Sequence, residues 1–253
     1  MNKTAVITGA SSGIGKSFAE CLAKRGYNLV LIARRKERLE HLAKVLPVQV
    51  QIFVADLTNE ADISELKSFL EKIDFEIFIN NAGFGDCGIF ETTSLEKELS
   101  MIDLNIKALH ILTKFVVAER KEKGGYLLNV ASCAGLMPAG PYMSTYYATK
   151  SYVTSFTSGI AFELKKKKSP LVVSCLCPGP VNTEFNERAS VEFALRGISA
   201  DKCVSFALKK MFRKQEIIIP GFFLRLGIFL GKFIPRSLYV SLAAYVQRKK
   251  MLS

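Results

Sequence analysis

Short apolar runs rich in β-branched residues alternate with longer helical patterns along this chain, and this alternation restricts its fold more than any other feature. Runs that are apolar at nearly every position need cover on both faces, which parallel strands joined by crossover helices provide. The sequence therefore predicts an α/β fold with a doubly wound parallel sheet of about seven strands. The predicted strands are Thr4–Thr8, Asn28–Ala33, Val48–Ala55, Glu76–Asn80, Tyr126–Ala131, Leu171–Cys177 and Glu216–Ile219.

The segments between these strands carry helix signals of their own. Lys36–Leu46 stops before a proline, Asn59–Lys72 opens with an Asn that can cap a helix, and Ser144–Lys168 is followed closely by another proline. No internal repeat or low-complexity linker interrupts the 253 residues. A chain of this length can bury one large core, so we expect a single domain over residues 1–253, with a helical tail over 221–253.

Composition excludes some classes of site and leaves others open. The net charge of +12 favours anionic partners, which include acidic lipid and phosphorylated cofactors. Nucleic acid is not expected, because no recognition motif accompanies the charge. The six cysteines form no CxxC pair, and His41 and His110 lie in helical patterns without other ligand types nearby, so neither disulfides nor a metal site are expected. The N-terminus lacks a secretory pattern, which predicts a cytoplasmic protein.

A glycine-rich turn follows the first predicted strand and leads directly into a helical pattern. It runs Thr8-Gly9-Ala10-Ser11-Ser12-Gly13-Ile14-Gly15, a Gly-x-x-x-Gly-x-Gly spacing. Glycines allow a tight turn and let backbone N–H groups approach a pyrophosphate at the positive end of a helix. Taken alone, such a turn is equally consistent with a simple strand-to-helix connection.

The residues after the second predicted strand bear on the choice of cofactor. Sites that prefer NAD place an acidic residue near this point to bind the ribose 2′-hydroxyl, but this chain has Arg34 and Arg35. A guanidinium can pair with a 2′-phosphate and stack on adenine. The sequence thus predicts NADP(H); in the alternative interpretation the two arginines merely begin a charged helix.

Tyr146 and Lys150 lie four residues apart at the start of a predicted helix, and hence on one face. A free phenol has a pKa near 10, and an adjacent ammonium stabilises its phenolate. The pair therefore suits acid–base chemistry. Tyr147, one step round the helix, is expected to pack rather than react.

Taken together, these motifs resemble those of the short-chain dehydrogenase/reductase family, whose Rossmann fold would then apply to nearly the whole chain. The resemblance implies that Ser132 holds a substrate oxygen against Tyr146, and that Asn105 serves a proton relay reaching Lys150 through water. Without it, Asn105 is equally a helix-bending or capping residue, and Ser132 a strand-end hydroxyl. The implied cofactor-binding residues are Gly9, Ser11, Ser12, Gly13, Ile14, Gly15, Arg34, Arg35, Asp56, Leu57, Asn81, Ala82, Gly83, Tyr146, Lys150, Pro178, Gly179, Val181 and Thr183.

The resulting functional hypothesis is an NADP(H)-dependent oxidoreductase that moves a hydride between nicotinamide and a carbonyl or alcohol. The rival hypothesis is a catalytically silent protein on the same fold, which senses NADP(H) or presents its tail to a membrane or partner. Loss of activity usually removes the Tyr or the Lys, and both are present here.

Two further segments bear on the substrate and on partners. The resemblance implies a substrate lid over residues 184–199, and its apolar members favour a lipophilic substrate, unless they only pack on the body: Phe185, Val191, Phe193, Ala194 and Leu195. The tail from Ile217 to Ser253 has six basic residues, no acidic one and many apolar ones. It is expected either to cover the pocket, to form a homo-oligomer interface (dimer or tetramer), or to rest peripherally on anionic membrane. A spanning helix is not expected, since charges and Pro235 interrupt the apolar run.

Overall fold

The computed structural model describes residues 3–184 and 197–251, and it is built on one seven-stranded parallel sheet. The strand order is β3-β2-β1-β4-β5-β6-β9, which confirms the predicted doubly wound sheet. The strands are β1 (Thr4–Thr8), β2 (Asn28–Ala33), β3 (Val50–Val54), β4 (Ile77–Asn80), β5 (Gly125–Val130), β6 (Leu171–Leu176) and β9 (Ile217–Ile218). β3 is shorter than its predicted apolar run because it is an edge strand, paired only with β2.

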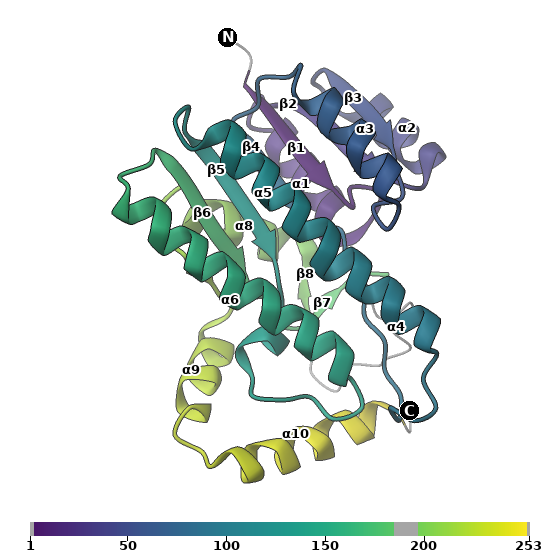
Figure 1. Ribbon diagram of the computed structural model, residues 1–253, viewed down its shortest axis with the longest axis vertical. Helices are drawn as coiled ribbons and strands as arrows, with labels where there is room; N and C mark the ends of the chain where they lie inside the picture. Colours follow the sequence, from purple (N-terminus) through teal and green to yellow (C-terminus); the bar gives the residue numbers. More distant parts are fainter. Residues whose placement is uncertain (1–2, 185–196, 252–253) are drawn as a thin grey trace.

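Helices cover both faces of the sheet (Figure 1). One face carries α1 (Gly13–Ala23), α2 (Lys36–Val45) and α8 (Ala200–Met211); the other carries α3 (Glu60–Leu70), α5 (Leu109–Arg120) and α6 (Ser144–Lys166). The predicted cap of α3 is confirmed, since the Asn59 side chain accepts a hydrogen bond of 2.9 Å from the Ala61 N–H. Two separate buried clusters follow, one on each side of the sheet.

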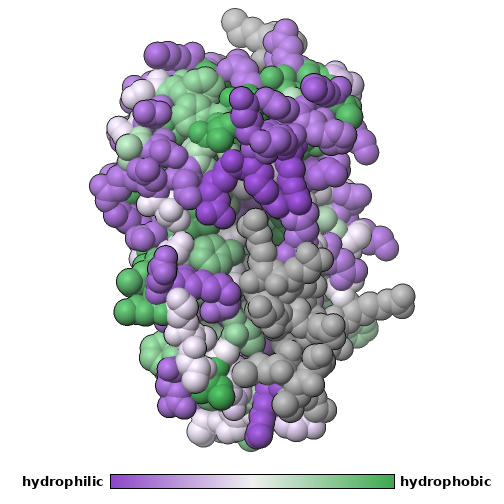
Figure 2. Space-filling model, turned by 90° about the vertical axis from the view of Figure 1, so that its right-hand side faces the viewer, coloured by the Kyte–Doolittle hydropathy of each residue, from purple (hydrophilic) through white to green (hydrophobic). Residues whose placement is uncertain are grey.

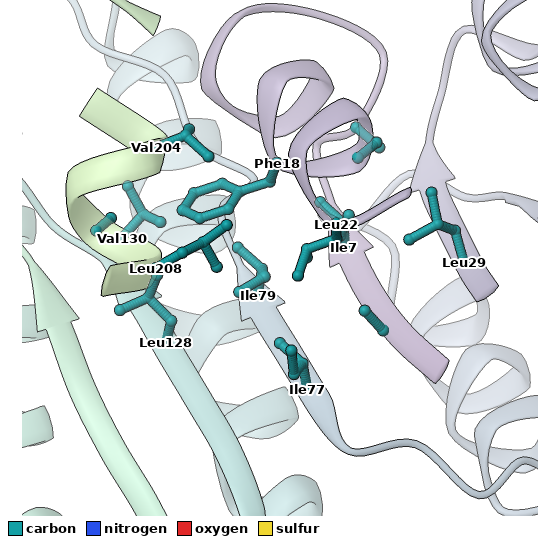
Figure 3. Close-up of a cluster of buried hydrophobic side chains, with 14 of the residues drawn as sticks. Ile7, Phe18, Leu22, Leu29, Ile77, Ile79, Leu128, Val130, Val204 and Leu208 are labelled. Carbon is teal, nitrogen blue, oxygen red and sulfur yellow. The ribbon is translucent and has the colours of Figure 1, made fainter. Parts of the chain in front are cut away.

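The first of these clusters fixes the helix that follows the glycine turn. Phe18 and Leu22 of α1 pack with Val204 and Leu208 of α8 over the central strands (Figure 3), and all four side chains are buried. Burying one such side chain stabilises the fold by roughly 1.5–3 kcal/mol. The N-terminus of α1 is therefore held rigidly at the carboxyl edge of the sheet, where the strand order reverses between β1 and β4.

The remaining elements gather at the carboxyl edge of the sheet. α4 (Leu95–Ile102) continues through a π-helical turn (Asp103–Ala108) into α5, and a 3₁₀ turn (Cys133–Leu136) follows β5. β7 (Val181–Asn182) pairs with β8 (Ile198–Ser199), so the last two residues of the predicted lid form a strand. The apolar residues of the predicted lid fall within positions 185–196, which lie outside the described residues.

The tail forms two helices, α9 (Phe222–Gly231) and α10 (Arg236–Met251). Both lie below the carboxyl edge of the sheet, at the bottom of Figure 1. Over the ranges 3–184 and 197–251, no helix is both long and apolar enough to cross a membrane. Within those same ranges, no cluster of three or more His, Cys, Asp or Glu is arranged to hold a metal ion.

Candidate active site

The carboxyl ends of the central strands border a cavity of about 500 Å³, and most of the predicted site residues line it. Among the predicted residues, only Gly15 and Asn105 are missing from its wall. The predicted residues that line it are Gly9, Ser11, Ser12, Gly13, Ile14, Arg34, Arg35, Asp56, Leu57, Asn81, Ala82, Gly83, Ser132, Tyr146, Lys150, Pro178, Gly179, Val181 and Thr183. One cavity thus joins the glycine turn to the candidate catalytic residues.

The glycine turn has a geometry that other residues would not tolerate. Gly9 and Gly13 have φ angles of +65° and +54°, which side chains with a Cβ rarely adopt. A Cβ on Gly15 would lie 2.2 Å from the Gly9 carbonyl oxygen, so a larger residue at position 15 would clash with the turn. Gly15 itself does not line the cavity. The N-terminus of α1 has no side-chain cap and no acidic residue in its first turn. Its positive end therefore fits the pyrophosphate of a dinucleotide.

The two arginines after β2 are held differently. Arg34 Nη1 lies 3.2 Å from Asp56 Oδ2, and both side chains border the cavity. Arg35 donates to the hydroxyls of Ser11 and Ser12 (2.7 Å for Ser12 Oγ) and pairs with Glu184 at 3.0 Å. Both arginines line the cavity, and Arg35 also contacts the glycine turn through Ser11 and Ser12.

Glu184 and Arg38 were not predicted as part of this cluster. Glu184 accepts from Arg35 and also from Arg38 Nη1 at 2.5 Å. These hydrogen bonds from Arg35 and then Arg38 hold the pKa of the Glu184 carboxyl below its ordinary value. An acidic residue at the predicted lid boundary was the only sequence signal for this contact.

Ser132, Tyr146 and Lys150 meet where β5 ends and α6 begins, and all three are buried. Tyr146 is hydrogen-bonded to Ser132. Lys150 Nζ donates to the Val130 carbonyl oxygen at 3.1 Å and lies 5.9 Å from the centroid of the Tyr146 ring. The fold thus brings the hydroxyls of Ser132 and Tyr146 and the ammonium of Lys150 into one compact group.

Burial dominates the titration of this group. It raises the pKa of Tyr146 well above its ordinary value, an effect that the hydrogen bond with Ser132 opposes. Burial also lowers the pKa of Lys150 to about 8. From sequence, the ammonium beside the phenol is the expected influence on the Tyr146 pKa. In the structure desolvation is the larger influence, so Tyr146 is protonated at neutral pH.

Asn105 lies in the π-helical turn and is completely buried. Its Nδ2 donates to the Phe84 carbonyl oxygen at 2.9 Å and to Thr149 Oγ1 at 3.1 Å, and its Oδ1 accepts from the Phe84 N–H at 3.1 Å. A Cβ on Gly83 would lie 2.8 Å from Asn105 Oδ1 and 3.3 Å from Lys150 Nζ. The side chain therefore ties the segment after β4 to α6, beside Lys150. Such π turns occur often at functional sites.

The tail supplies a wall of the cavity that the sequence did not assign residue by residue. Its lining residues are Leu224, Ile234, Tyr239, Leu242, Ala243, Val246 and Gln247. Gln247 Nε2 donates to the Tyr147 hydroxyl, and both side chains are buried. Tyr147 packs as expected, with its ring 2.3 Å from where a Gly140 Cβ would be, but it also lines the cavity. No local pattern marked Gln247.

A family model described as short chain dehydrogenase matches residues 3–192. The chain belongs to this family. Over 199 residues it is 32% identical to a very-long-chain 3-oxoacyl-CoA reductase from Anas platyrhynchos, covering 75% of this chain and 63% of that protein.

Among solved structures, a short-chain dehydrogenase from Sphingobium yanoikuyae in complex with NADPH is 34% identical with a TM-score of 0.81, covering 91% of this chain and 93% of that one. A bulky-bulky ketone specific alcohol dehydrogenase from Comamonas testosteroni is 30% identical with a TM-score of 0.76, covering 93% and 96%. A more distant fold neighbour is a complex with NAD. Family membership therefore establishes an oxidoreductase that uses a nicotinamide cofactor and leaves NAD or NADP open.

Proposed function

We propose that this chain is an NADP(H)-dependent carbonyl reductase for a lipophilic substrate, with the reverse alcohol oxidation using the same groups. The observation that carries the proposal is the single cavity that joins an arginine-flanked glycine turn to the buried Ser132, Tyr146 and Lys150. The predicted cofactor contacts and catalytic roles are part of this proposal, as is the single oxidoreductase domain.

Three side chains on the cavity wall carry out the proposed chemistry. The cofactor, when bound, supplies a hydride to the carbonyl carbon. Tyr146, protonated at neutral pH, donates its phenolic proton to the carbonyl oxygen. Ser132 hydrogen-bonds that oxygen and holds it against Tyr146. Lys150, charged below a pH of about 8, stabilises the phenolate that remains.

Asn105 is a positioning residue in this scheme. Its Oδ1 and the Lys150 Nζ lie 2.8 and 3.3 Å from the point that a Gly83 Cβ would occupy, and a water molecule between the two atoms would link them. Tyr146 would regain its proton along this route. The rigid bonds from Asn105 to Phe84 and Thr149 keep the relay geometry fixed.

The preference for NADP(H) is supported by the absence of an acidic residue at the end of β2 and by Arg34 and Arg35 at that place. A 2′-phosphate would receive charge-assisted hydrogen bonds from these guanidinium groups. The complex of the Sphingobium relative with NADPH agrees with this preference.

A lipophilic substrate is supported by the apolar tail residues in the wall, together with Met137 and Met143. The names of two relatives, a very-long-chain 3-oxoacyl-CoA reductase and a bulky-bulky ketone specific alcohol dehydrogenase, point to a large ketone.

We further propose a homo-oligomer through α4, where Leu95, Leu99 and Ile102 form an exposed stripe at helical spacing. Native mass measurement of Leu99→Asp tests this, since the variant should be smaller than the wild type.

The function is tested by binding of NADPH and NADH to the wild type, Arg34→Ala and Arg35→Ala, followed by turnover. The substrates are a panel of aldehydes, ketosteroids and 3-ketoacyl thioesters. We expect tighter binding of NADPH than NADH, reduced by either substitution, and turnover that Tyr146→Phe abolishes while Tyr147→Phe retains it. Tight NADPH binding without turnover would favour the sensor hypothesis, and no nucleotide binding would contradict both.

A further inference from the structure

Helix α9 has two opposed faces, of which only one is used by the fold. On the inner face, Leu224 lines the cavity and Ile228 is buried. The outer face carries exposed apolar side chains at i, i+4, i+7, i+8 and i+11 from the first of them, with one more beside it. These are Phe222, Phe223, Leu226, Phe229, Leu230 and, just beyond the helix, Phe233. At about 100° per residue they occupy an arc of roughly 120°.

The exposure of this outer face is unusual for large aromatic residues. Phe223 is 85% exposed and Phe233 is 74% exposed, and the rings of Phe229 and Phe233 contact each other with centroids 5.5 Å apart. Contiguous exposed apolar surface of this kind marks an interaction site. Figure 2 looks at the side of the molecule opposite α9, and hydrophilic side chains predominate in the upper half of that face.

The charges beside the outer face identify the partner. Arg225 and Lys232, seven residues apart, border the apolar arc on the same side, and residues 217–253 contain no acidic side chain. In an antiparallel two-fold pairing of this face, the basic flanks of both copies would lie on the same side and repel. An anionic lipid surface instead attracts them while the phenylalanine rings enter the interface.

The tail that carries this face also lines the cavity. Leu242 and Val246 of α10 line it and are 51% and 44% exposed. Leu238 and Tyr245 are exposed on the same helix. The cavity wall and the exposed apolar side chains of the tail therefore belong to the same two helices.

We propose that the outer face of α9 rests on an anionic lipid surface, and that an apolar substrate passes from this lipid into the cavity that α9 and α10 line. The first part of the proposal does not depend on the cofactor or on the catalytic groups. The second part rests on the proposed function.

The absence of tryptophan from the chain allows a direct test. Phe223→Trp places a single fluorophore on the outer face, and Phe162→Trp places one on α6, where the ring is 61% exposed with the Lys166 ammonium 5.6 Å away. With vesicles of phosphatidylcholine and phosphatidylglycerol, emission of Phe223→Trp should shift to the blue, and that of Phe162→Trp should not. An unshifted Phe223→Trp, or equal shifts in both, would overturn the proposal.

Sedimentation with the same vesicles separates the two contributions to binding. Each basic residue at an anionic surface strengthens partitioning about fivefold, so Arg225→Gln with Lys232→Gln should weaken it about 25-fold at low salt. Phe223→Ser with Phe229→Ser should abolish it, while the control pair Phe90→Ser with Phe162→Ser binds as the wild type. Circular dichroism of each variant verifies that it is folded. If the wild type ignores vesicles and Phe223→Ser with Phe229→Ser converts an oligomer to a smaller species, the face is a contact between copies and the proposal fails.

Substrate entry is tested by its own measurement. If substrate comes from the lipid, turnover of a long-chain ketone embedded in anionic vesicles should fall in the Phe223→Ser, Phe229→Ser variant, while turnover of a short water-soluble ketone is unchanged. Equal loss with both ketones would overturn entry from the lipid without touching vesicle binding. Absence of all turnover in the wild type would instead contradict the proposed function.

Discussion

If the proposed 2′-phosphate of the cofactor binds Arg35, Glu184 competes with it, and replacing Glu184 with glutamine should tighten NADPH binding. Its carboxylate pairs with Arg35 at 3.0 Å and with Arg38 at 2.5 Å. The Glu184 carboxylate and a 2′-phosphate would share the hydrogen-bond donors and the charge of one guanidinium, so each weakens the binding of the other. Arg35 remains held by Ser11 and Ser12 after Glu184 loses its charge, so the cation stays in place to receive the cofactor.

The magnitude follows from the exposure of the pairs. The side chains of Glu184 and Arg35 are 39% and 27% exposed, and Arg38 is more exposed still. Solvent-screened pairs of this kind contribute about 0.2–1 kcal/mol each. Removing both from competition should strengthen NADPH binding by about 1 kcal/mol, which is roughly fivefold. NADH lacks the 2′-phosphate, so its affinity should not change.

Calorimetric titration of Glu184→Gln with NADPH and with NADH measures both affinities. Glu40→Gln on α2 is the matched control, because it removes the same charge from a pair with Lys36 and leaves Arg35 untouched. Arg35 and Arg38 keep the Glu184 pKa below its ordinary value, so the carboxylate is charged at neutral pH and the competition is fully present there. Weaker NADPH binding by Glu184→Gln, or an equal change for NADH, would refute the competition.

Three further predictions concern the buried groups. Reduction should slow as the pH rises through about 8, because burial lowers the pKa of Lys150 to about 8 and the side chain is charged only below that value. A pH profile of kcat/KM for the wild type should show this decrease. The same decrease in Lys150→Arg would contradict its assignment to Lys150. Gly15→Ala should lower the free energy of unfolding by about 1–3 kcal/mol, since its Cβ would meet the Gly9 carbonyl oxygen at 2.2 Å. The control Gly159→Ala, in open space within α6, should raise the free energy of unfolding by up to about 1 kcal/mol. Urea denaturation that ranks the two variants in the opposite order would disprove this. Gln247→Leu and Tyr147→Phe should be coupled by about 0.5–1.5 kcal/mol in a double-mutant cycle of unfolding free energies, because each substitution removes one partner of the same buried hydrogen bond. Additive effects would show that this hydrogen bond adds no stability.

The features that sequence predicted well are local ones. The runs of β1 and β2 match their predicted bounds residue for residue, because a short, β-branched apolar run between turn residues is typical of an inner strand covered on both faces. The glycine turn was equally local, since its spacing and its place between strand and helix are written within eight residues. The Tyr146 and Lys150 pair needed only the period of a helix.

Contacts between distant segments were not predictable in this way. Gln247 meets Tyr147 across 100 positions, and Arg35 meets Glu184 across 149. Neither contact leaves a periodic pattern, because each depends on how separate elements are brought together by the sheet. The π-helical turn that carries Asn105 was also missed, since it shifts hydrogen bonds without changing which residues are apolar.

The division between predicted and unpredicted residues has a functional consequence. The family match ends at residue 192, and the proposed catalytic and cofactor-binding residues, from Gly9 to Thr183, all precede that point. The cavity wall formed by Leu224, Tyr239 and Leu242 lies beyond it. We infer that the matched region determines the reaction while the tail determines which molecule undergoes it. Substitutions in the tail should therefore change KM and substrate preference at an unchanged pH profile, because Lys150 and Tyr146 remain in the same buried surroundings.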